Sequence, residues 1–217
     1  ALSSALVAGM MASGMDPFLA MAVGLLAGLV MGIVNGIIIA KGKVAPFIAT
    51  LATMTIFRGL TLVYMDGRPI TGLGDHLMFQ MFGRGYFLGI PVPAVTMMIA
   101  FAVLYFILKK TTFGRRTFAI GGNEEAAALS GINVTRIKVM IYGLSGILAA
   151  LAGIVLTSRL DSAQPTAGTS YELDAIAAVV LGGTSLSGGR GWIVGTFIGV
   201  LIIGVLNNGL NLLGVSS

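Results

Sequence analysis

The side chains of this sequence offer few of the groups on which catalysis or metal binding depends. The chain has one histidine, His76, and no cysteine, which excludes thiolate metal sites and the usual nucleophile–base pairs. A lone histidine also argues against a His-cluster metal site. Glu172 and Asp174 are two residues apart and would face different sides of a helix. We therefore predict a protein that is not an enzyme, with no catalytic residues, no metal site and no bound cofactor.

One glycine-rich stretch comes close to a phosphate-binding loop. Residues 183–190 read Gly-Thr-Ser-Leu-Ser-Gly-Gly-Arg, but Gly189 stands where lysine is required, and no serine or threonine follows it. The stretch also joins two apolar segments rather than a strand and a helix. We interpret it as a flexible turn, so any ATP chemistry must come from another polypeptide.

Neutral amides and hydroxyls within the apolar segments could line a path for a hydroxyl-rich solute. Hydrogen bonding between helices is their commoner role, typically worth under about 1–2 kcal/mol each. Asn207 and Asn211 share a helix face. Arg58 costs at least ~2.5 kcal/mol at depth unless it pairs or reaches the interface. The candidates for the path are Asn35, Arg58, Thr184, Ser185, Asn207 and Asn211.

Composition places these residues in a membrane protein. The 217-residue chain is 56% hydrophobic and 10% charged, with a mean hydropathy of +0.98, whereas soluble domains carry roughly 25% charged residues. Such a chain can cover its surface only where that surface faces lipid. Because the apolar runs are long and uninterrupted, they favour helices over a β-barrel. We predict an all-α polytopic transmembrane helix bundle.

About seven apolar segments make up the predicted bundle. A span needs about 20 residues, and four or five segments reach that length. The sixth is short and ends in Gly182-Gly183, which predicts a half-span, a re-entrant piece or an interrupted helix. The segments are Ala1–Met15, Pro17–Ala40, Pro46–Tyr64, Val92–Leu108, Ile137–Thr157, Leu173–Leu186 and Trp192–Leu213.

A faint repeat relates two of these segments. Gly28, Gly32 and Asn35-Gly36 recur as Gly199, Gly204 and Asn208-Gly209. If every segment crosses, the two copies run in opposite directions, as in the inverted repeats of many transporters. Chance recurrence in glycine-rich sequence is the alternative.

Basic residues predict the orientation of the bundle. If every segment crosses, nine Lys and Arg residues lie on one side, and the positive-inside rule makes that side cytoplasmic. Three arginines, with Glu172, could contact an extracytoplasmic protein; solvated loop charge and helix capping are the alternatives. The nine are Lys41, Lys43, Lys109, Lys110, Arg115, Arg116, Arg136, Lys138 and Arg190. The opposite side holds Arg68, Arg84 and Arg159 beside Asp16, Asp66, Asp75, Asp161 and Glu172.

The stretch Gly121–Lys138 predicts a short helix with defined ends. Its two glycines interrupt the upstream structure. Asn123 is a good N-cap, Glu124 and Glu125 suit the first turn, and Gly131 can stop the helix in a left-handed conformation. A helix of about seven residues is marginal in water and needs a surface to dock on. That surface is either its own bundle or a cytoplasmic partner.

Longer motifs connect this stretch to a family. Residues 125–131 fit the pattern Glu-Ala-Ala-x3-Gly, found in the cytoplasmic loop of ATP-binding-cassette importer permeases. The ordered motifs GGNEEAAALSGINV, SAQPTAGTSYELDAIAAVVLGGTSLSGG, GVLNNGLNLLGVSS and AKGKVAPFIATLATMTIFRG resemble the ribose-type sugar permeases of bacteria. The resemblance covers essentially the whole chain.

The resemblance implies the permease subunit of an ATP-driven, binding-protein-dependent importer of ribose or a similar monosaccharide in the bacterial cytoplasmic membrane. The implied partners are ATPase subunits carrying ATP and Mg²⁺, an extracytoplasmic sugar-binding protein and a second permease copy. Residues 1–217 would form one domain of a roughly ten-span bundle, lacking N-terminal spans and the last span. Residues 121–138 would be its cytoplasmic coupling segment. The ATPase contacts would be Asn123, Glu124, Glu125, Ala126, Ala127, Leu129 and Gly131.

One departure qualifies the resemblance. The broader importer pattern continues toward Ile-x-Leu-Pro, but Gly131 is followed by Ile132, Asn133 and Val134, so we do not expect the hinge of other importer classes. Two alternatives stay open: a secondary transporter or channel, and a purely structural membrane partner. Ion coupling calls for carboxylates within a span, and apart from Asp174 near an interface the spans contain none.

Overall fold

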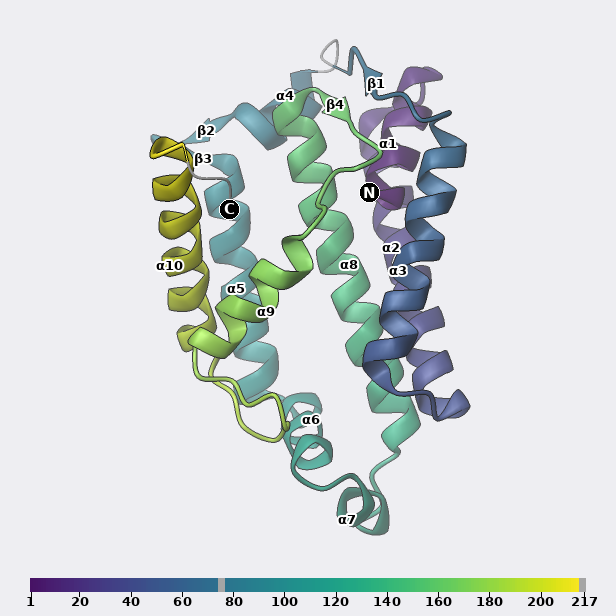
Figure 1. Ribbon diagram of the computed structural model, residues 1–217, viewed down its shortest axis with the longest axis vertical. Helices are drawn as coiled ribbons and strands as arrows, with labels where there is room; N and C mark the ends of the chain where they lie inside the picture. The colour runs from purple at the N-terminus through teal and green to yellow at the C-terminus, as the bar shows by residue number, and fades with distance from the viewer. Residues whose placement is uncertain (74–76, 215–217) are drawn as a thin grey trace. The chain divides into compact units, whose positions relative to one another are not determined.

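The computed structural model of this chain describes residues 1–73 and 77–214; Asp75 and His76 lie outside the described residues. Five of the described helices are long and apolar enough to cross a membrane (Figure 1). These are α2 (Pro17–Gly42), α3 (Pro46–Tyr64), α5 (Val92–Lys110), α8 (Val134–Leu160) and α10 (Ile193–Leu212). The predicted all-α, polytopic membrane fold is confirmed.

Shorter elements complete the described part of the chain. Two antiparallel strand pairs join β1 (Ile70–Thr71) to β4 (Ser162–Ala163) and β2 (Tyr86–Phe87) to β3 (Ile90–Pro91). The shorter helices are α1 (Leu2–Ala12), α4 (Leu77–Arg84), α6 (Thr112–Gly122), α7 (Glu124–Leu129) and α9 (Tyr171–Leu181).

All seven predicted apolar segments form helices, and the predicted short one is α9. Its 11 residues extend about 16 Å, roughly half the thickness of a hydrocarbon core. Helices α4 and α6 were not predicted. Both contain polar residues and both are too short to be recognised as spans.

The chain divides into two compact units. The first contains Ala1–Met97 and Thr135–Gly168, and the second contains Met98–Val134 and Thr169–Ser217. Each unit contains spanning helices, and each is described here by itself. The prediction that residues 1–217 form one permease domain stays a prediction.

A stripe of glycines sets the packing of α2 against α8 in the first unit. An added Cβ at Gly28 would lie 2.5 Å from the Ala150 Cβ, and one at Gly36 would lie 2.7 Å from the Val139 Cα. Later residues of α2 therefore meet earlier residues of α8, so the two helices are antiparallel and their backbones touch. Small residues at this spacing allow such approach in membranes. The buried stripe is Gly24, Gly28, Gly32 and Gly36.

The second glycine pattern does not reproduce this packing. Gly199 of α10 is buried against the Ala178 carbonyl of α9, but an added Cβ at Gly204 or Gly209 meets nothing within 4 Å. Within the described residues, the faint sequence repeat has no matching set of helix contacts.

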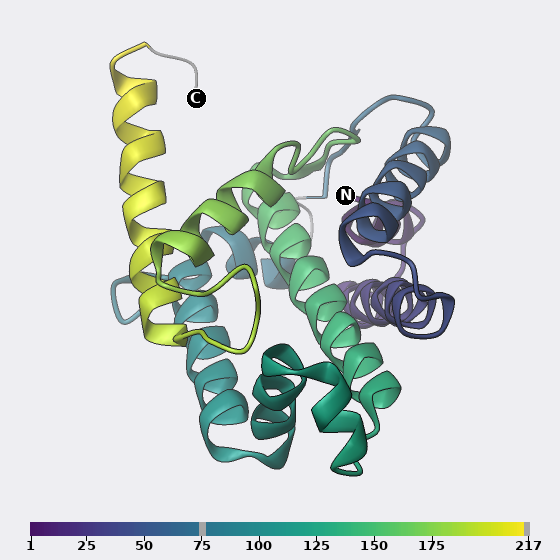
Figure 2. The ribbon, with the colours of Figure 1, turned by 60° about the horizontal axis from the view of Figure 1, so that its bottom comes forward.

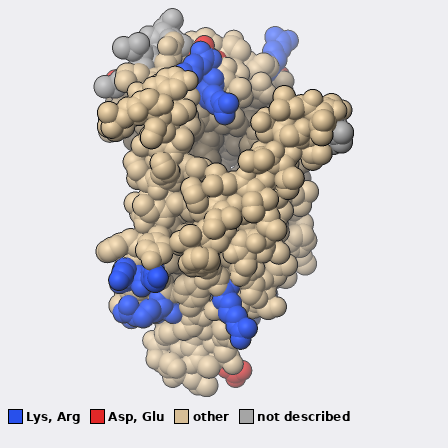
Figure 3. All heavy atoms as spheres, turned by 90° about the vertical axis from the view of Figure 1, so that its left-hand side faces the viewer, with Lys and Arg blue, Asp and Glu red and all other residues tan. Residues whose placement is uncertain are grey.

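Each unit has a group of basic residues at one of its ends. Because α2 and α8 are antiparallel, Lys41 and Lys43 lie at the same end of the first unit as Arg136 and Lys138. In the second unit, the basic residues lie at the end of α5, in α6 and in the loop before α10. Figure 3 shows a broad band without charged side chains between blue side chains of Lys and Arg. These second-unit residues are Lys109, Lys110, Arg115, Arg116 and Arg190.

Candidate functional site

Helix α7 begins as its sequence predicts. Asn123 has extended backbone angles (φ −157°, ψ 108°), and its Oδ1 accepts a hydrogen bond from the Ala126 N–H at 2.9 Å. Such a cap stabilises a helix by roughly 0.5–2 kcal/mol. Glu124 and Glu125 occupy the first turn, where the positive end of the helix dipole favours carboxylates. The helix has six residues, one fewer than predicted.

A Schellman motif ends α7 at the predicted glycine. The Ile132 N–H donates to the Ala127 carbonyl at 3.1 Å, and the Gly131 N–H donates to the Ala128 carbonyl at 3.0 Å. Gly131 has φ +81°, a left-handed conformation that costs a residue with a Cβ roughly 1–2 kcal/mol. Both ends of α7 are therefore fixed by hydrogen bonds within residues 123–132.

Helix α7 leaves most of its surface uncovered. Ala127 is 5% exposed, whereas Leu129 is 85% exposed, and the other four residues of the helix are exposed as well. The helix packs against α6, and Figure 2 shows the two in succession at the front of the molecule. One small side chain is thus directed into the protein, while an exposed leucine and an acidic first turn are directed outward.

Two glycine pairs join α6 to the loop between α9 and α10. An added Cβ at Gly188 would lie 2.7 Å from the Gly121 oxygen, and one at Gly189 would lie 2.7 Å from the Gly122 Cα. The backbones are in direct contact, and no side chain fits between them. Gly121 and Gly122 end α6 and immediately precede the α7 cap. In the sequence, the two separate Gly-Gly pairs are the only signal of this contact.

The loop at residues 183–190 is a turn closed by its own hydrogen bonds. The Ser185 N–H donates to the Arg190 carbonyl at 2.9 Å, and the Gly188 N–H donates to the Ser185 carbonyl at 3.2 Å. The Ser185 hydroxyl accepts from the Ser187 N–H at 3.2 Å. The amides of Ser185, Ser187 and Gly188 are thus engaged within the turn. Thr184 and Ser185, two candidates for the substrate path, belong to this turn.

A polar pair links α9 and α10 within the second unit. The Asn207 Nδ2 donates to the Asp174 Oδ2 at 3.2 Å, and both residues are half-buried. The sequence analysis grouped Asn207 with Asn211, but Asn211 is exposed. Asp174 lies in the first turn of α9, so the length of that helix separates this pair from the turn containing Thr184.

The remaining path candidates belong to the first unit. The Oδ1 atom of Asn35 in α2 is buried and lacks a hydrogen-bond partner among the residues that the structure describes. An unsatisfied buried acceptor costs roughly 1–3 kcal/mol. Arg58 is half-buried in α3. Within the second unit, the structure places Thr184 with Ser185 in one turn and pairs Asn207 with Asp174; Asn35 and Arg58 belong to the first unit.

Two of the three predicted outer arginines lie together in the first unit. The Arg84 Nε donates to the Arg159 carbonyl at 3.0 Å. Helix α4 holds this arrangement, because Phe79 is buried and its carbonyl accepts from the Ser158 hydroxyl at the end of α8. Arg84 and Arg159 are exposed, as is Arg68. Glu172, the fourth predicted contact, belongs to the second unit.

Metal ligands do not cluster in the part of the chain that the structure describes. Within residues 1–73 and 77–214, no three His, Cys, Asp or Glu side chains lie close enough together to hold an ion. The observed arrangement consists of an exposed capped helix, a glycine contact behind it and one half-buried polar pair between two apolar helices.

Known proteins resemble this chain along its whole length. The family described as "Branched-chain amino acid transport system / permease component" matches residues 1–217. The ribose import permease protein of Bacillus subtilis (strain 168) is 77% identical over 217 residues, which are 100% of this chain and 67% of that protein. The ribose import permease protein of Escherichia coli (strain K12) is 54% identical over 219 residues, covering 100% of this chain and 68% of that protein.

A permease named for another sugar is also similar. The L-arabinose transport system permease protein of Escherichia coli (strain K12) is 46% identical over 179 residues, covering 82% of this chain and 54% of that protein. No solved structure matches the chain.

Proposed function

Because this chain belongs to the permease component family of branched-chain amino acid transport systems, we propose that it is the membrane-spanning subunit of an importer for ribose or a similar monosaccharide. It is a multi-pass membrane protein and a transport subunit rather than an enzyme. The relatives named for ribose and L-arabinose support a sugar as the solute. The observation that carries the proposal is α7, a capped helix of six residues with most of its surface uncovered.

In this proposal, α7 docks on a separate ATPase subunit at the cytoplasmic face. The exposed Leu129 supplies an apolar contact, and Glu124 and Glu125 present carboxylates beside it. ATP and Mg²⁺ are held by the ATPase, and this chain binds no cofactor. Closure of the ATPase pair displaces α7, and ATP favours one access state through contacts that differ between the two states.

The glycine contact supplies a route from α7 to the spanning helices. Gly121 and Gly122 precede α7, and Gly188 and Gly189 precede α10. A displacement of α7 thus reaches the start of α10 through touching backbones, without any side chain that could rotate out of the way. Helix α10 carries Asn207, so the movement acts on the polar pair with Asp174.

We place the sugar path beside that polar pair. A carboxylate accepts hydrogen bonds, and an amide both donates and accepts them, so together they match the hydroxyls of a neutral sugar. Few specific contacts are expected, because tight binding would stall release. At the other face, Arg68, Arg84 and Arg159 are proposed to meet acidic residues of a sugar-binding protein, with a second permease copy completing the path.

A secondary transporter is the alternative that one observation favours. Asp174 is a half-buried carboxylate on the otherwise largely apolar helix α9, which is the kind of group that ion-coupled carriers use. In that case, uptake would follow a proton or sodium gradient and would not need ATP.

Reconstitution separates the two functions. The full-length permease is combined in vesicles with its ATPase and sugar-binding protein, and ribose uptake is measured together with ATP hydrolysis. We expect uptake only with ATP and with both partners, and we expect ribose-loaded binding protein to stimulate hydrolysis. Uptake driven by an ion gradient without ATP would overturn the proposal and support the alternative.

A further inference from the structure

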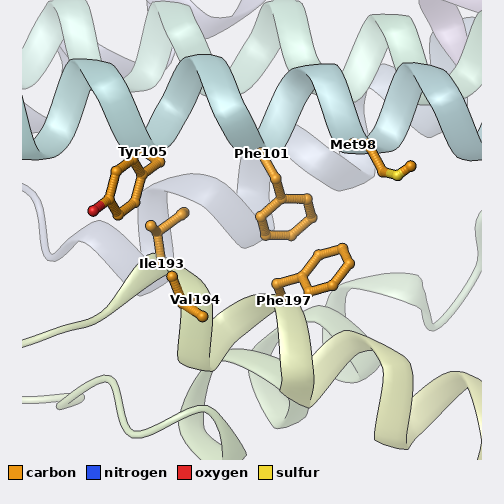
Figure 4. Close-up of a pocket in the computed structure, with 6 residues that line it drawn as sticks. All are labelled: Met98, Phe101, Tyr105, Ile193, Val194 and Phe197. Atoms are coloured by element: carbon orange, nitrogen blue, oxygen red, sulfur yellow. The ribbon is translucent and has the colours of Figure 1, made fainter.

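A groove with an apolar lining lies between α5 and α10 in the second unit (Figure 4). It encloses about 220 Å³. The rings of Phe101 and Phe197 meet edge to face at its centre, with centroids 5.2 Å apart and planes at 77°. The lining consists of Met98, Phe101, Tyr105, Ile193, Val194 and Phe197. Tyr105 carries the one polar group of the lining, and its hydroxyl is at one end of the groove (Figure 4).

A positive charge lies at that end of the groove. The Lys109 Nζ donates to the Tyr105 hydroxyl at 3.0 Å and lies 5.2 Å from the centre of the Tyr105 ring. An ammonium has three donors, so two are left for another acceptor, and Lys109 is exposed. The apolar groove therefore ends at an oriented cation.

The charge around this end is not balanced by nearby acids in the sequence. Lys110, Arg115 and Arg116 follow Lys109 along α5 and α6, and no Asp or Glu occurs between residues 92 and 122. Basic sites between helices at the cytoplasmic side of membranes attract anionic lipid headgroups. A neutral alkyl chain would fill the groove but would leave the cation without a counterion.

We propose that this groove binds an anionic phospholipid, with one acyl chain along the aromatic lining and the phosphate at Lys109 and Tyr105. From Met98 to Tyr105, α5 rises about 10 Å, which matches the upper part of an acyl chain entering from the headgroup region. The lipid would bridge α5, which leads into α6, and α10, which carries Asn207. This inference stands apart from the proposed sugar transport and does not depend on it.

The chain contains its own reporter for this site. Trp192 is the single tryptophan of the sequence, is 58% exposed and directly precedes Ile193 and Val194 of the groove. Brominated acyl chains quench tryptophan fluorescence on contact. The full-length permease is placed in phosphatidylcholine vesicles containing rising fractions of brominated phosphatidylglycerol or, separately, brominated phosphatidylcholine. The fluorescence of a Trp192→Phe variant is subtracted as background, so that the remaining signal comes from Trp192.

We expect half-maximal quenching at a several-fold lower fraction of brominated phosphatidylglycerol than of brominated phosphatidylcholine. In Lys109→Gln the preference for phosphatidylglycerol over phosphatidylcholine should fall about five-fold. This is the fold-change that corresponds to about 1 kcal/mol, the contribution of one basic residue near a membrane surface. Lys110→Gln is the matched control, because it removes the same charge from the adjacent exposed position, and it should change the preference less than two-fold.

Three results would overturn the inference. Equal quenching by the two lipids would show a groove that does not select a headgroup. Equal losses in Lys109→Gln and Lys110→Gln would show diffuse surface attraction instead of a site. Absence of quenching by either lipid would show that protein, such as a second copy of this chain, covers the groove.

Discussion

Single residues decide the ends of α7 through hydrogen bonds to residues close by in the chain. The Asn123 Oδ1 accepts a hydrogen bond from the N–H three residues later in the chain, and the Gly131 N–H donates to the carbonyl three residues earlier. The Asn207–Asp174 bond joins residues 33 positions apart. No local rule reports such a pairing, and helical spacing pointed to Asn211 instead. The caps were therefore predicted correctly, whereas the partner of Asn207 was missed.

Leu129 gives the first prediction at this scale. Leu129→Ser should weaken binding of the permease to its ATPase subunit at least about tenfold, the loss expected if Leu129 is an anchor at the centre of the interface. Its side chain is 85% exposed, so the free energy of unfolding should change by less than about 0.5 kcal/mol. Affinity is measured between the full-length permease in nanodiscs and the isolated ATPase.

The control for this prediction is Leu88→Ser. Leu88 is 89% exposed in the turn between β2 and β3, and its loss should leave the affinity for the ATPase unchanged. Equal affinities for wild type and Leu129→Ser would argue that α7 rests on its own bundle.

Asp174 gives the second prediction. Asp174→Asn keeps a hydrogen-bond acceptor for Asn207 but removes the charge, whereas Asp174→Leu removes both. If the pair binds sugar hydroxyls, Asp174→Asn should retain at least about a third of wild-type uptake, while Asp174→Leu should lose about tenfold or more, the discrimination expected for an unpaired polar group. Uptake of radiolabelled ribose into the reconstituted vesicles measures both variants. A complete loss in Asp174→Asn would point to ion coupling.

At the scale of elements, hydrophobic length was sufficient to find every spanning helix, because a span must bury about 20 apolar residues in lipid. It could not find α4 or α6, which lie outside that constraint. Helix α6 begins at a Thr111 cap and carries Arg115 and Arg116, so its sequence reads as a polar loop. A tertiary contact positions this helix: Gly114 packs against the Leu108 backbone at the end of α5.

The glycine contact gives a prediction at the element scale. In Gly121→Ala, the new Cβ would lie 2.5 Å from the Gly189 nitrogen, so the α9–α10 loop must move away from α6. We expect the ratio of ribose transported to ATP hydrolysed to fall several-fold, with a stability loss of about 1–3 kcal/mol, typical of overpacking. The ratio is measured in vesicles, and stability is measured by thermal unfolding.

Gly122→Ala is the neighbouring control. A Cβ at Gly122 meets nothing within 4 Å, although the substitution has the same effect on helix propensity. It should keep the wild-type transport ratio. If the ratio of ribose transported to ATP hydrolysed falls in both variants, the cause is a change in helix α6 and not the contact with Gly189. If Gly121→Ala keeps the wild-type ratio, the glycine contact has no part in the proposed mechanism.

At the scale of the whole molecule, the distribution of charge predicts orientation. Each unit has a group of Lys and Arg residues at an end that the positive-inside rule assigns to the cytoplasm. The chain has no cysteine, so single cysteines can be introduced without background from these residues. A cysteine at Leu129 should react with an impermeant maleimide only from the cytoplasmic side, and one at Leu88 only from the opposite side.

Inside-out and right-side-out vesicles provide that measurement. Both positions are highly exposed, so a failure to react would not result from burial within the chain. Labelling of both cysteines from one side would show that the segments between them cross an even number of times. That result would contradict the orientation taken from the positive-inside rule.

The closed hydrogen-bonding of α7 has a consequence for how such permeases can be rebuilt. Residues 123–132 satisfy their own helix ends, and only Ala127 among the helix residues is buried. If α7 docks on the ATPase as proposed, the stretch is an exchangeable module. Grafting the equivalent ten residues from a permease that serves another ATPase should then change which ATPase is bound, while the membrane bundle and its solute stay the same. Recognition of the energy source and recognition of the cargo can then diverge independently within one chain.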